Sequence, residues 1–260
     1  MFEVVFAQTA LLKKIVDAVR ELNETVSLDI SASGISLQTM DSSRVSLVTL
    51  LLRADSFGGT FKCDRSMTLG VNLKALTKLL KTAGNEDQTT LRAEDDASTL
   101  IIVIDSPKEG KVSSFELKLL DLNVEPLAVY DTDAKATVTM SSAEFSRICR
   151  DLGTIGDTVV IDAQKDGVSF SVTGDELSGN VTLRPSEAAD DSESSVNLQI
   201  EEALQQSFAL RFLNMFTKAT PLSNTVILSL SPEQPFCVEY QIEDAGAIKY
   251  FLAPKIEDTE

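Results

Sequence analysis

Four segments of the chain repeat their apolar residues at spacings of three and four. In residues 9–22, for example, Leu12, Ile15 and Val19 fall on one face of a helix with 3.6 residues per turn. The same spacing occurs in residues 72–83, 142–152 and 209–219. We therefore predict four amphipathic helices, each burying one face.

Between these helices, short β-branched or alternating runs predict strands. They end at turn signals such as Ser33-Gly34 and Asp166-Gly167. Because the strands follow one another in runs and do not alternate singly with helices, we predict antiparallel sheets and an α+β class. The clearest runs are VSLDISAS (26–33), VSLVTLLLRA (45–54), TLIIVID (99–105), VVIDA (159–163) and VILSLS (226–231).

The pattern also repeats along the chain, so the two halves are homologous. Residues 9–22 align with residues 142–155 at an offset of 133, and a second match joins residues 71–83 to residues 208–220 at an offset of 137. Equivalent pairs include Leu12 and Phe145, Ile15 and Ile148, Gly34 and Gly167, Leu73 and Leu210, and Leu76 and Leu213.

The repeat predicts a domain at residues 1–118 and another at residues 135–260. Residues 119–134 lack a helical period and are predicted to be an extended connector. The acidic, serine-rich stretch at residues 185–195 is predicted to be a solvated loop.

Charge is unevenly distributed along the chain. The net charge of −17 would by itself argue against nucleic acid. However, the four helical segments together carry +6 and the remaining residues −23. Exposed helix faces collect lysine and arginine in many proteins. If the helices share one surface, though, they would form a weakly positive track for phosphates. The chain has no tryptophan, so we expect nonspecific backbone contacts without base stacking.

The sequence contains few candidates for the catalytic residues of common enzymes. The chain has no histidine, and Cys63, Cys149 and Cys237 are far apart, as expected of reduced thiols. We predict no cofactor and no metal. An enzymatic alternative is a metal-dependent hydrolase that uses acidic residues such as Asp95, Asp96 and Asp105. The amino terminus has no basic start followed by a long apolar run, so neither secretion nor membrane insertion is expected.

Longer motifs carry a resemblance that covers the whole chain. Over its full length, the sequence resembles the proliferating cell nuclear antigen family of eukaryotic DNA sliding clamps. The resemblance implies a non-enzymatic homotrimer in the nucleus, in which two similar clamp domains per subunit assemble into a six-domain ring around duplex DNA. The motifs are MDSSRVSLV (40–48), FKCDR (61–65), GVNLKALTKLLKTAGNED (70–87), SRICRDL (146–152), FTKATPLS (216–223) and YFLAPKI (250–256).

The resemblance also implies residue roles. Candidate DNA-facing cations are Lys13, Lys14, Arg20, Lys78, Lys81, Arg147, Arg150, Arg211 and Lys218, with Lys111 as a less certain addition. A pocket for short hydrophobic partner peptides would consist of Met40, Arg44, Val45, Leu47, Leu127, Val129, Pro235, Tyr250, Ala253 and Pro254. By pattern alone, Val45 and Leu47 in an alternating strand are core residues, and only the resemblance favours the pocket.

Partners implied in the same way are DNA polymerase, a clamp-loader ATPase, flap endonuclease and DNA ligase. Subunits would join through edge strands at residues 111–119 and 176–183, with Phe115 as anchor. Lys165 stands where the family carries a lysine that accepts ubiquitin. The alternative within the family is a specialised, checkpoint-type clamp subunit that assembles with different partners. The predicted interface residues are Phe115, Lys111, Leu117, Leu177 and Val181.

Overall fold

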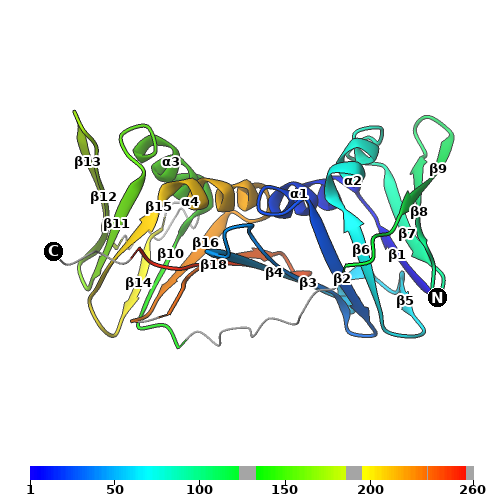
Figure 1. The fold of residues 1–260 in the computed structure, drawn as a ribbon, viewed down its shortest axis with the longest axis horizontal. Helices are drawn as coiled ribbons and strands as arrows, with labels where there is room; N and C mark the ends of the chain where they lie inside the picture. Colours follow the sequence, from blue (N-terminus) through cyan, green and yellow to red (C-terminus); the bar gives the residue numbers. More distant parts are fainter. Residues whose placement is uncertain (123–132, 186–194, 233, 256–260) are drawn as a thin grey trace. The chain divides into compact units, whose positions relative to one another are not determined.

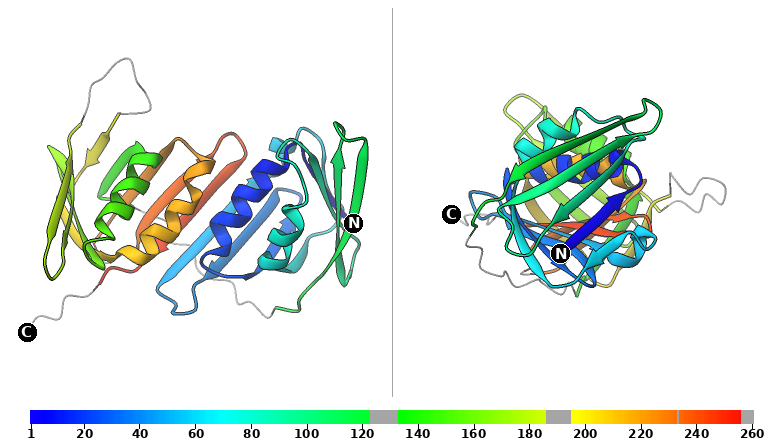
Figure 2. Two further views of the ribbon diagram at one scale, coloured as in Figure 1. Left: turned by 90° about the horizontal axis from the view of Figure 1, so that it is seen from above. Right: turned by 90° about the vertical axis from the view of Figure 1, so that its right-hand side faces the viewer.

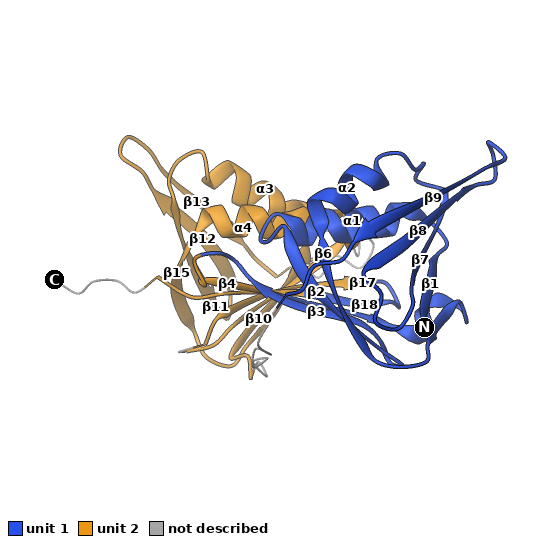
Figure 3. Ribbon diagram, turned by 45° about the vertical axis from the view of Figure 1, so that its right-hand side comes forward, with its two compact units in different colours: residues 1–42, 48–127, 242–248 blue, residues 43–47, 128–241, 249–260 orange. Residues whose placement is uncertain are grey.

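The computed structural model describes residues 1–122, 133–185, 195–232 and 234–255 (Figure 1). The chain divides into two compact units (Figure 3). Unit 1 comprises residues 1–42, 48–127 and 242–248, and unit 2 comprises residues 43–47, 128–241 and 249–260. Two short segments, residues 43–47 and 242–248, therefore belong to the unit opposite to the one that their sequence position predicts.

Unit 1 contains two sheets and two α-helices. One sheet has the strand order β5-β1-β7-β8-β9, and the other contains β4-β3-β2-β6 in that order. The helices are α1 (Thr9–Arg20) and α2 (Leu73–Leu80), and a short 3-10 helix, η1, spans Ala54–Phe57. The strands are β1 (Phe2–Phe6), β2 (Thr25–Ser31), β3 (Gly34–Met40), β4 (Ser46–Arg53), β5 (Phe61–Cys63), β6 (Met67–Asn72), β7 (Gln88–Ala93), β8 (Thr99–Ser106) and β9 (Lys111–Lys118).

Unit 2 repeats this plan. It contains the consecutive sheet strands β14-β10-β16-β17-β18 and a four-stranded sheet of order β13-β12-β11-β15. Its helices are α3 (Ser142–Leu152) and α4 (Leu210–Phe216), followed by the 3-10 helix η2 (Thr217–Leu222). The strands are β10 (Ala136–Ser141), β11 (Thr158–Gln164), β12 (Gly167–Thr173), β13 (Ser178–Leu183), β14 (Asn197–Ile200), β15 (Leu204–Ala209), β16 (Thr225–Leu230), β17 (Phe236–Ile242) and β18 (Gly246–Leu252).

Within each unit the two α-helices lie side by side over the strands (Figure 2). Their apolar stripes explain this placement, because the buried residues of α1 include Leu12, Ile15 and Val19, as the periodicity predicted. At the equivalent positions of α3, Phe145 and Ile148 are also buried. The α+β class and the internal repeat are confirmed, and the paired strands in the described part of the chain, such as β1 with β7 and β11 with β12, are antiparallel.

The predicted turn glycines have a steric role. Gly34 begins β3 with φ +141°, and a Cβ there would lie 2.0 Å from the carbonyl oxygen of Leu52. Only glycine allows the two backbones to approach so closely. At the equivalent Gly167, a Cβ would lie 2.8 Å from the carbonyl oxygen of Leu183, so the second unit repeats the constraint.

One detail differs from the predictions, and two predicted segments stay largely untested. The helix of residues 209–219 ends at Phe216 and continues as η2, which contains Pro221, a residue without an N–H for helical hydrogen bonding. Most of the predicted connector and of the loop at residues 185–195 lies outside the described residues. Among the helices that the structure describes, none is both long and apolar enough to cross a membrane.

Candidate nucleic-acid interface and docking surfaces

In unit 1, an open groove runs between α1 and α2. Its volume is about 300 Å³, and its walls combine apolar side chains with charges of both signs. Four of the charged residues lining the groove are Lys13, Asp17, Arg20 and Lys81. The groove therefore presents predicted DNA-facing cations beside a carboxylate.

Lys13 is more constrained than the sequence suggested. Its Nζ donates to the carbonyl oxygen of Ala83 at 2.7 Å and to Oδ1 of Asn85 at 3.1 Å. The amino group therefore ties α1 to the loop that follows α2. Lys13 therefore has a structural role in addition to its place in the groove, and two of the three N–H donors of its ammonium are already used.

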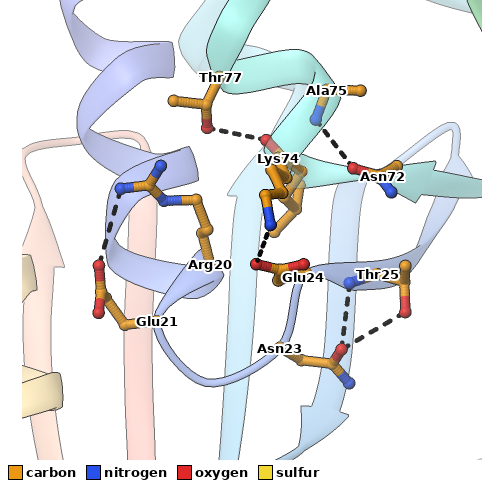
Figure 4. Close-up of polar contacts among 10 residues, drawn as sticks. Arg20, Glu21, Asn23, Glu24, Thr25, Asn72, Lys74, Ala75 and Thr77 are labelled. Carbon is orange, nitrogen blue, oxygen red and sulfur yellow. Dashed lines mark hydrogen bonds and ion pairs between the residues drawn. The ribbon is translucent and has the colours of Figure 1, made fainter.

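The start of α2 is fixed by polar contacts drawn in Figure 4. The side chain of Asn72 accepts a hydrogen bond from the backbone N–H of Ala75 at 2.8 Å and so caps the helix. Lys74 pairs with Glu24 at 3.2 Å. Lys78 and Lys81, further along, are exposed.

In unit 2, both predicted arginines of α3 are paired with carboxylates of the same helix. Nη2 of Arg147 lies 2.7 Å from Oε1 of Glu144, and Nε of Arg150 lies 3.3 Å from Oδ1 of Asp151. The hydrogen bond that Arg147 donates to the carboxylate of Glu144 raises the pKa of Arg147. In unit 1, Arg20 resembles them, because Asp17 lies 3.5 Å and Glu21 3.7 Å from its Nη2 (Figure 4 shows the contact with Glu21).

The remaining cations are less restrained. The guanidinium of Arg211 on α4 lies 4.7 Å from the ring centre of Phe212, which leaves its N–H groups available. Across residues 1–122, 133–185, 195–232 and 234–255, no ion pair involves Lys14, Lys78, Lys81 or Lys218, and all four are exposed. These four lysines and Arg211 therefore supply accessible positive charge.

Lys111 is set apart from the helices, at the start of the edge strand β9. Its charge contributes, with that of Lys13, to lowering the pKa of Asp87. The larger causes of that shift are hydrogen bonds donated to Asp87 by the hydroxyl of Ser106 and the N–H of Gly84.

Several predicted pocket residues meet in unit 2. The N–H of Ala253 donates to the carbonyl oxygen of Val45 at 3.1 Å, and the N–H of Lys255 donates to the carbonyl oxygen of Ser207 at 2.7 Å.

The predicted pocket residues differ in exposure. Ala253 is exposed and Leu47 is buried, whereas Val45, Pro235 and Pro254 are half-buried. Arg44 is exposed, with φ +58°. Met40 ends β3 in unit 1, and Leu127 and Val129 lie outside the described residues.

The position of Tyr250 does not agree with its predicted place in the pocket. Its side chain is 0% exposed, and its ring stacks on Phe216 of α4 with centroids 4.6 Å apart. Alternate residues of a strand face opposite sides, so Phe251 points away from the helices. We therefore remove Tyr250 from the pocket. The alternation along β18 accounts for this burial, because Ile248 and Tyr250 share one face and Lys249 between them faces the other way.

The predicted subunit-interface strands lie at sheet edges. β9 is the outermost strand of the order β5-β1-β7-β8-β9, and β13 is an outermost strand of the four-stranded sheet. Val112 on β9 is 67% exposed and Leu177, immediately before β13, is 64% exposed. Phe115, Leu117 and Val181 are half-buried. Exposed apolar residues beside unpaired backbone are typical of a strand that pairs with another chain.

Other candidate positions carry less chemistry. Lys165 is exposed in the two-residue turn between β11 and β12. Burial raises the pKa of the Cys149 thiol and that of Cys237, the latter to about 12, so both are unreactive core residues.

The proposed hydrolase ligands are not brought together. Asp95 and Asp96 lie in the turn before β8, whereas Asp105 lies near its far end, about 20 Å away along an extended strand. Within the described part of the chain, no cluster of three or more Cys, Asp or Glu side chains could hold a metal.

Comparison with known families explains this combination of repeated units and basic helices. Residues 1–128 match the N-terminal domain of proliferating cell nuclear antigen, and residues 128–255 match its C-terminal domain. The chain belongs to the proliferating cell nuclear antigen family. It is therefore a sliding clamp, a non-enzymatic scaffold that acts on DNA in replication and repair.

Proposed function

We propose that the chain forms a homotrimeric ring around duplex DNA in the nucleus. There it serves as a processivity factor for the replicative polymerase and as a docking platform for partner peptides. The observation that carries the proposal is the segregation of charge: basic residues gather on the helices of both units, while the rest of the chain carries −23. Such a distribution attracts phosphates to one type of surface and repels them elsewhere.

The internal repeat supports closure through the sheet edges. Strand β18 corresponds to β9, and β4 corresponds to β13, because each occupies the same place in the repeated sheet orders. In unit 1, the N–H of Arg53 at the end of β4 donates to Ala245, just before β18. In unit 2, Ala253, just after β18, donates to Val45, just before β4. We infer that β9 of one copy pairs with β13 of a second copy in the same manner.

Partner peptides would dock in unit 2 around Val45, Ala253 and Pro254. Half-buried apolar side chains beside an exposed one provide a surface for a hydrophobic plug. Polymerase, clamp-loader ATPase, flap endonuclease and DNA ligase are the expected partner classes. Lys165, exposed in its turn, is the proposed acceptor of ubiquitin.

Topological retention tests the clamp itself. The loaded protein should stay on closed circular DNA in high salt and leave once the circle is cut, because enclosure does not depend on ionic contacts. If the protein stayed on the DNA after linearisation, it would be bound by ordinary contacts, and the proposal would be contradicted.

Native mass in solution tests the assembly. Three chains per particle are expected. A stable monomer at micromolar concentration, or assembly only with other clamp chains, would favour the specialised-subunit alternative.

The docking surface has a separate test. Val45→Ala and Leu127→Ala should each weaken binding of a short hydrophobic clamp-binding peptide while leaving the oligomer intact. Lys165→Ala, in a distant turn, is the matched control and should bind the peptide normally. Unchanged affinity in both pocket variants would refute this location.

A further inference from the structure

The arginines of α1 and α3 are held differently from Arg211 on α4 and from most of the helix lysines. The three arginines of α1 and α3 each have a carboxylate of the same helix close to the guanidinium. Four exposed helix lysines form no ion pair within the described residues, whereas Lys74 pairs with Glu24. The paired arginines are Arg20, Arg147 and Arg150, and the unpaired lysines are Lys14, Lys78, Lys81 and Lys218.

This difference matters because the two cations bind phosphate differently. A guanidinium presents a planar fork that can hold one phosphate through two parallel hydrogen bonds. A lysine ammonium is a hydrated point charge on a flexible stem and imposes no such geometry. An unrestrained arginine would therefore create a local free-energy minimum for a duplex that moves past it. A lysine would create a shallower minimum.

We propose that Asp17, Glu21, Glu144 and Asp151 attenuate the three arginines, so that they attract duplex DNA without holding individual phosphates. The inference rests on the proposed function and concerns the regulation of the same surface. Each carboxylate competes for the guanidinium and also repels an approaching phosphate.

The exposure of these pairs fits a displaceable role. The side chains of Arg147 and Arg150 are 61% and 69% exposed in their pairs. Exposed ion pairs contribute little to stability, so a passing phosphate can replace the carboxylate briefly at small cost. The pairs therefore set the strength of DNA attraction more than they set the stability of the helices.

A charge-matched comparison tests the proposal with the full chain. The helix variant combines Asp17→Asn, Glu21→Gln, Glu144→Gln and Asp151→Asn. The control variant combines Asp96→Asn, Asp166→Asn, Glu94→Gln and Glu109→Gln, which are exposed residues in turns or loops. Both variants gain the same net charge. Affinity for a short linear duplex is measured across a salt series, and thermal denaturation verifies folding.

We expect the helix variant to bind the duplex about tenfold more tightly than wild type at low salt. Its affinity should also fall more steeply with salt, because more phosphates are contacted. The control should change at most about twofold, since its carboxylates neighbour no helix arginine. Equal gains in the two variants would overturn the proposal in favour of a simple effect of net charge.

A second set separates the arginine pairing from direct repulsion. The same four helix substitutions are made in a background carrying Arg20→Gln, Arg147→Gln and Arg150→Gln. If the carboxylates act through the arginines, the gain in affinity should be mostly lost, and an undiminished gain would contradict the inference. If wild type and every variant lack salt-sensitive duplex binding, the proposed DNA-binding function fails as well.

Discussion

Strand by strand, unit 1 corresponds to unit 2, with β5-β1-β7-β8-β9 matching β14-β10-β16-β17-β18 and β4-β3-β2-β6 matching β13-β12-β11-β15. The helices differ in charge. Residues 9–22 and 72–83 total +4, whereas residues 142–152 and 209–219 total +2. Lys78 and Lys81, which follow Lys74 along the chain, form no ion pair within the described residues, whereas the arginines of α3 are paired with carboxylates. The apolar pattern therefore maintains the fold in both units, whereas the charges on the helix surfaces differ between them.

The largest effect is expected where the two cores use different residues at equivalent positions. Phe145 is 0% exposed and packs near Phe170, with ring centroids 6.3 Å apart. Phe145→Ala should lower the free energy of unfolding by about 3–5 kcal/mol, because the cavity cannot fully collapse. The equivalent Leu12→Ala in unit 1 should cost about 2–4 kcal/mol. Chemical denaturation measures both, and a smaller loss for Phe145→Ala would show that the second core relaxes more easily.

The next largest effect is expected at the edge strands β9 and β13, compared with an apolar residue elsewhere on the surface. Phe115→Asp should dissociate the proposed trimer, since a charge in a packed interface costs about 2 kcal/mol or more. Leu51→Asp is the control, because Leu51 is 49% exposed on β4, away from β9 and β13. Native mass and circular dichroism distinguish a folded monomer from an unfolded chain. A trimer that survives Phe115→Asp at micromolar concentration would argue against pairing through β9.

A smaller effect should distinguish the cations of the two units. Lys78→Ala with Lys81→Ala removes unpaired charge from unit 1, and we expect about tenfold weaker duplex binding at low salt. Arg147→Ala with Arg150→Ala removes paired charge from unit 2 and should weaken binding only about twofold to threefold. Salt-dependent affinity measurements compare the two double variants. Equal losses would mean that the carboxylates on α3 do not shield its arginines.

What could be predicted from the sequence was local. The four helices and the repeat follow from spacings of three and four residues, and Asp17 with Arg20 or Glu144 with Arg147 are visible as neighbours on a helix. Lys13 could not be assigned in this way, because its partners Ala83 and Asn85 are about seventy residues away. Tyr250 is a different case: its pocket role came from the family resemblance, whereas the alternation of Ile248, Lys249 and Tyr250 favours a buried position.

The smallest effect concerns how the two leading helices begin. In unit 2, the side chain of Ser141 accepts from the N–H of Glu144, so α3 carries its own cap. In unit 1, α1 has no side-chain cap, and the N–H groups of Thr9 and Ala10 donate to the carbonyl oxygens of Asp87 and Asn85. The start of α1 therefore depends on the loop that the Asp87 carboxylate holds.

This contrast predicts different responses to pH. Hydrogen bonds from Ser106 and Gly84 lower the pKa of Asp87 below its ordinary value of 3.8. The stabilisation is therefore complete above about pH 4 and is lost as the pH falls through the lower folded-state pKa. Asp87→Asn should destabilise the protein near neutral pH, with the difference shrinking in acid. Ser141→Ala should cost about 1 kcal/mol at every pH. Unfolding free energies measured from neutral pH into acid test both, and a pH-independent Asp87→Asn effect would exclude the carboxylate as the support of α1.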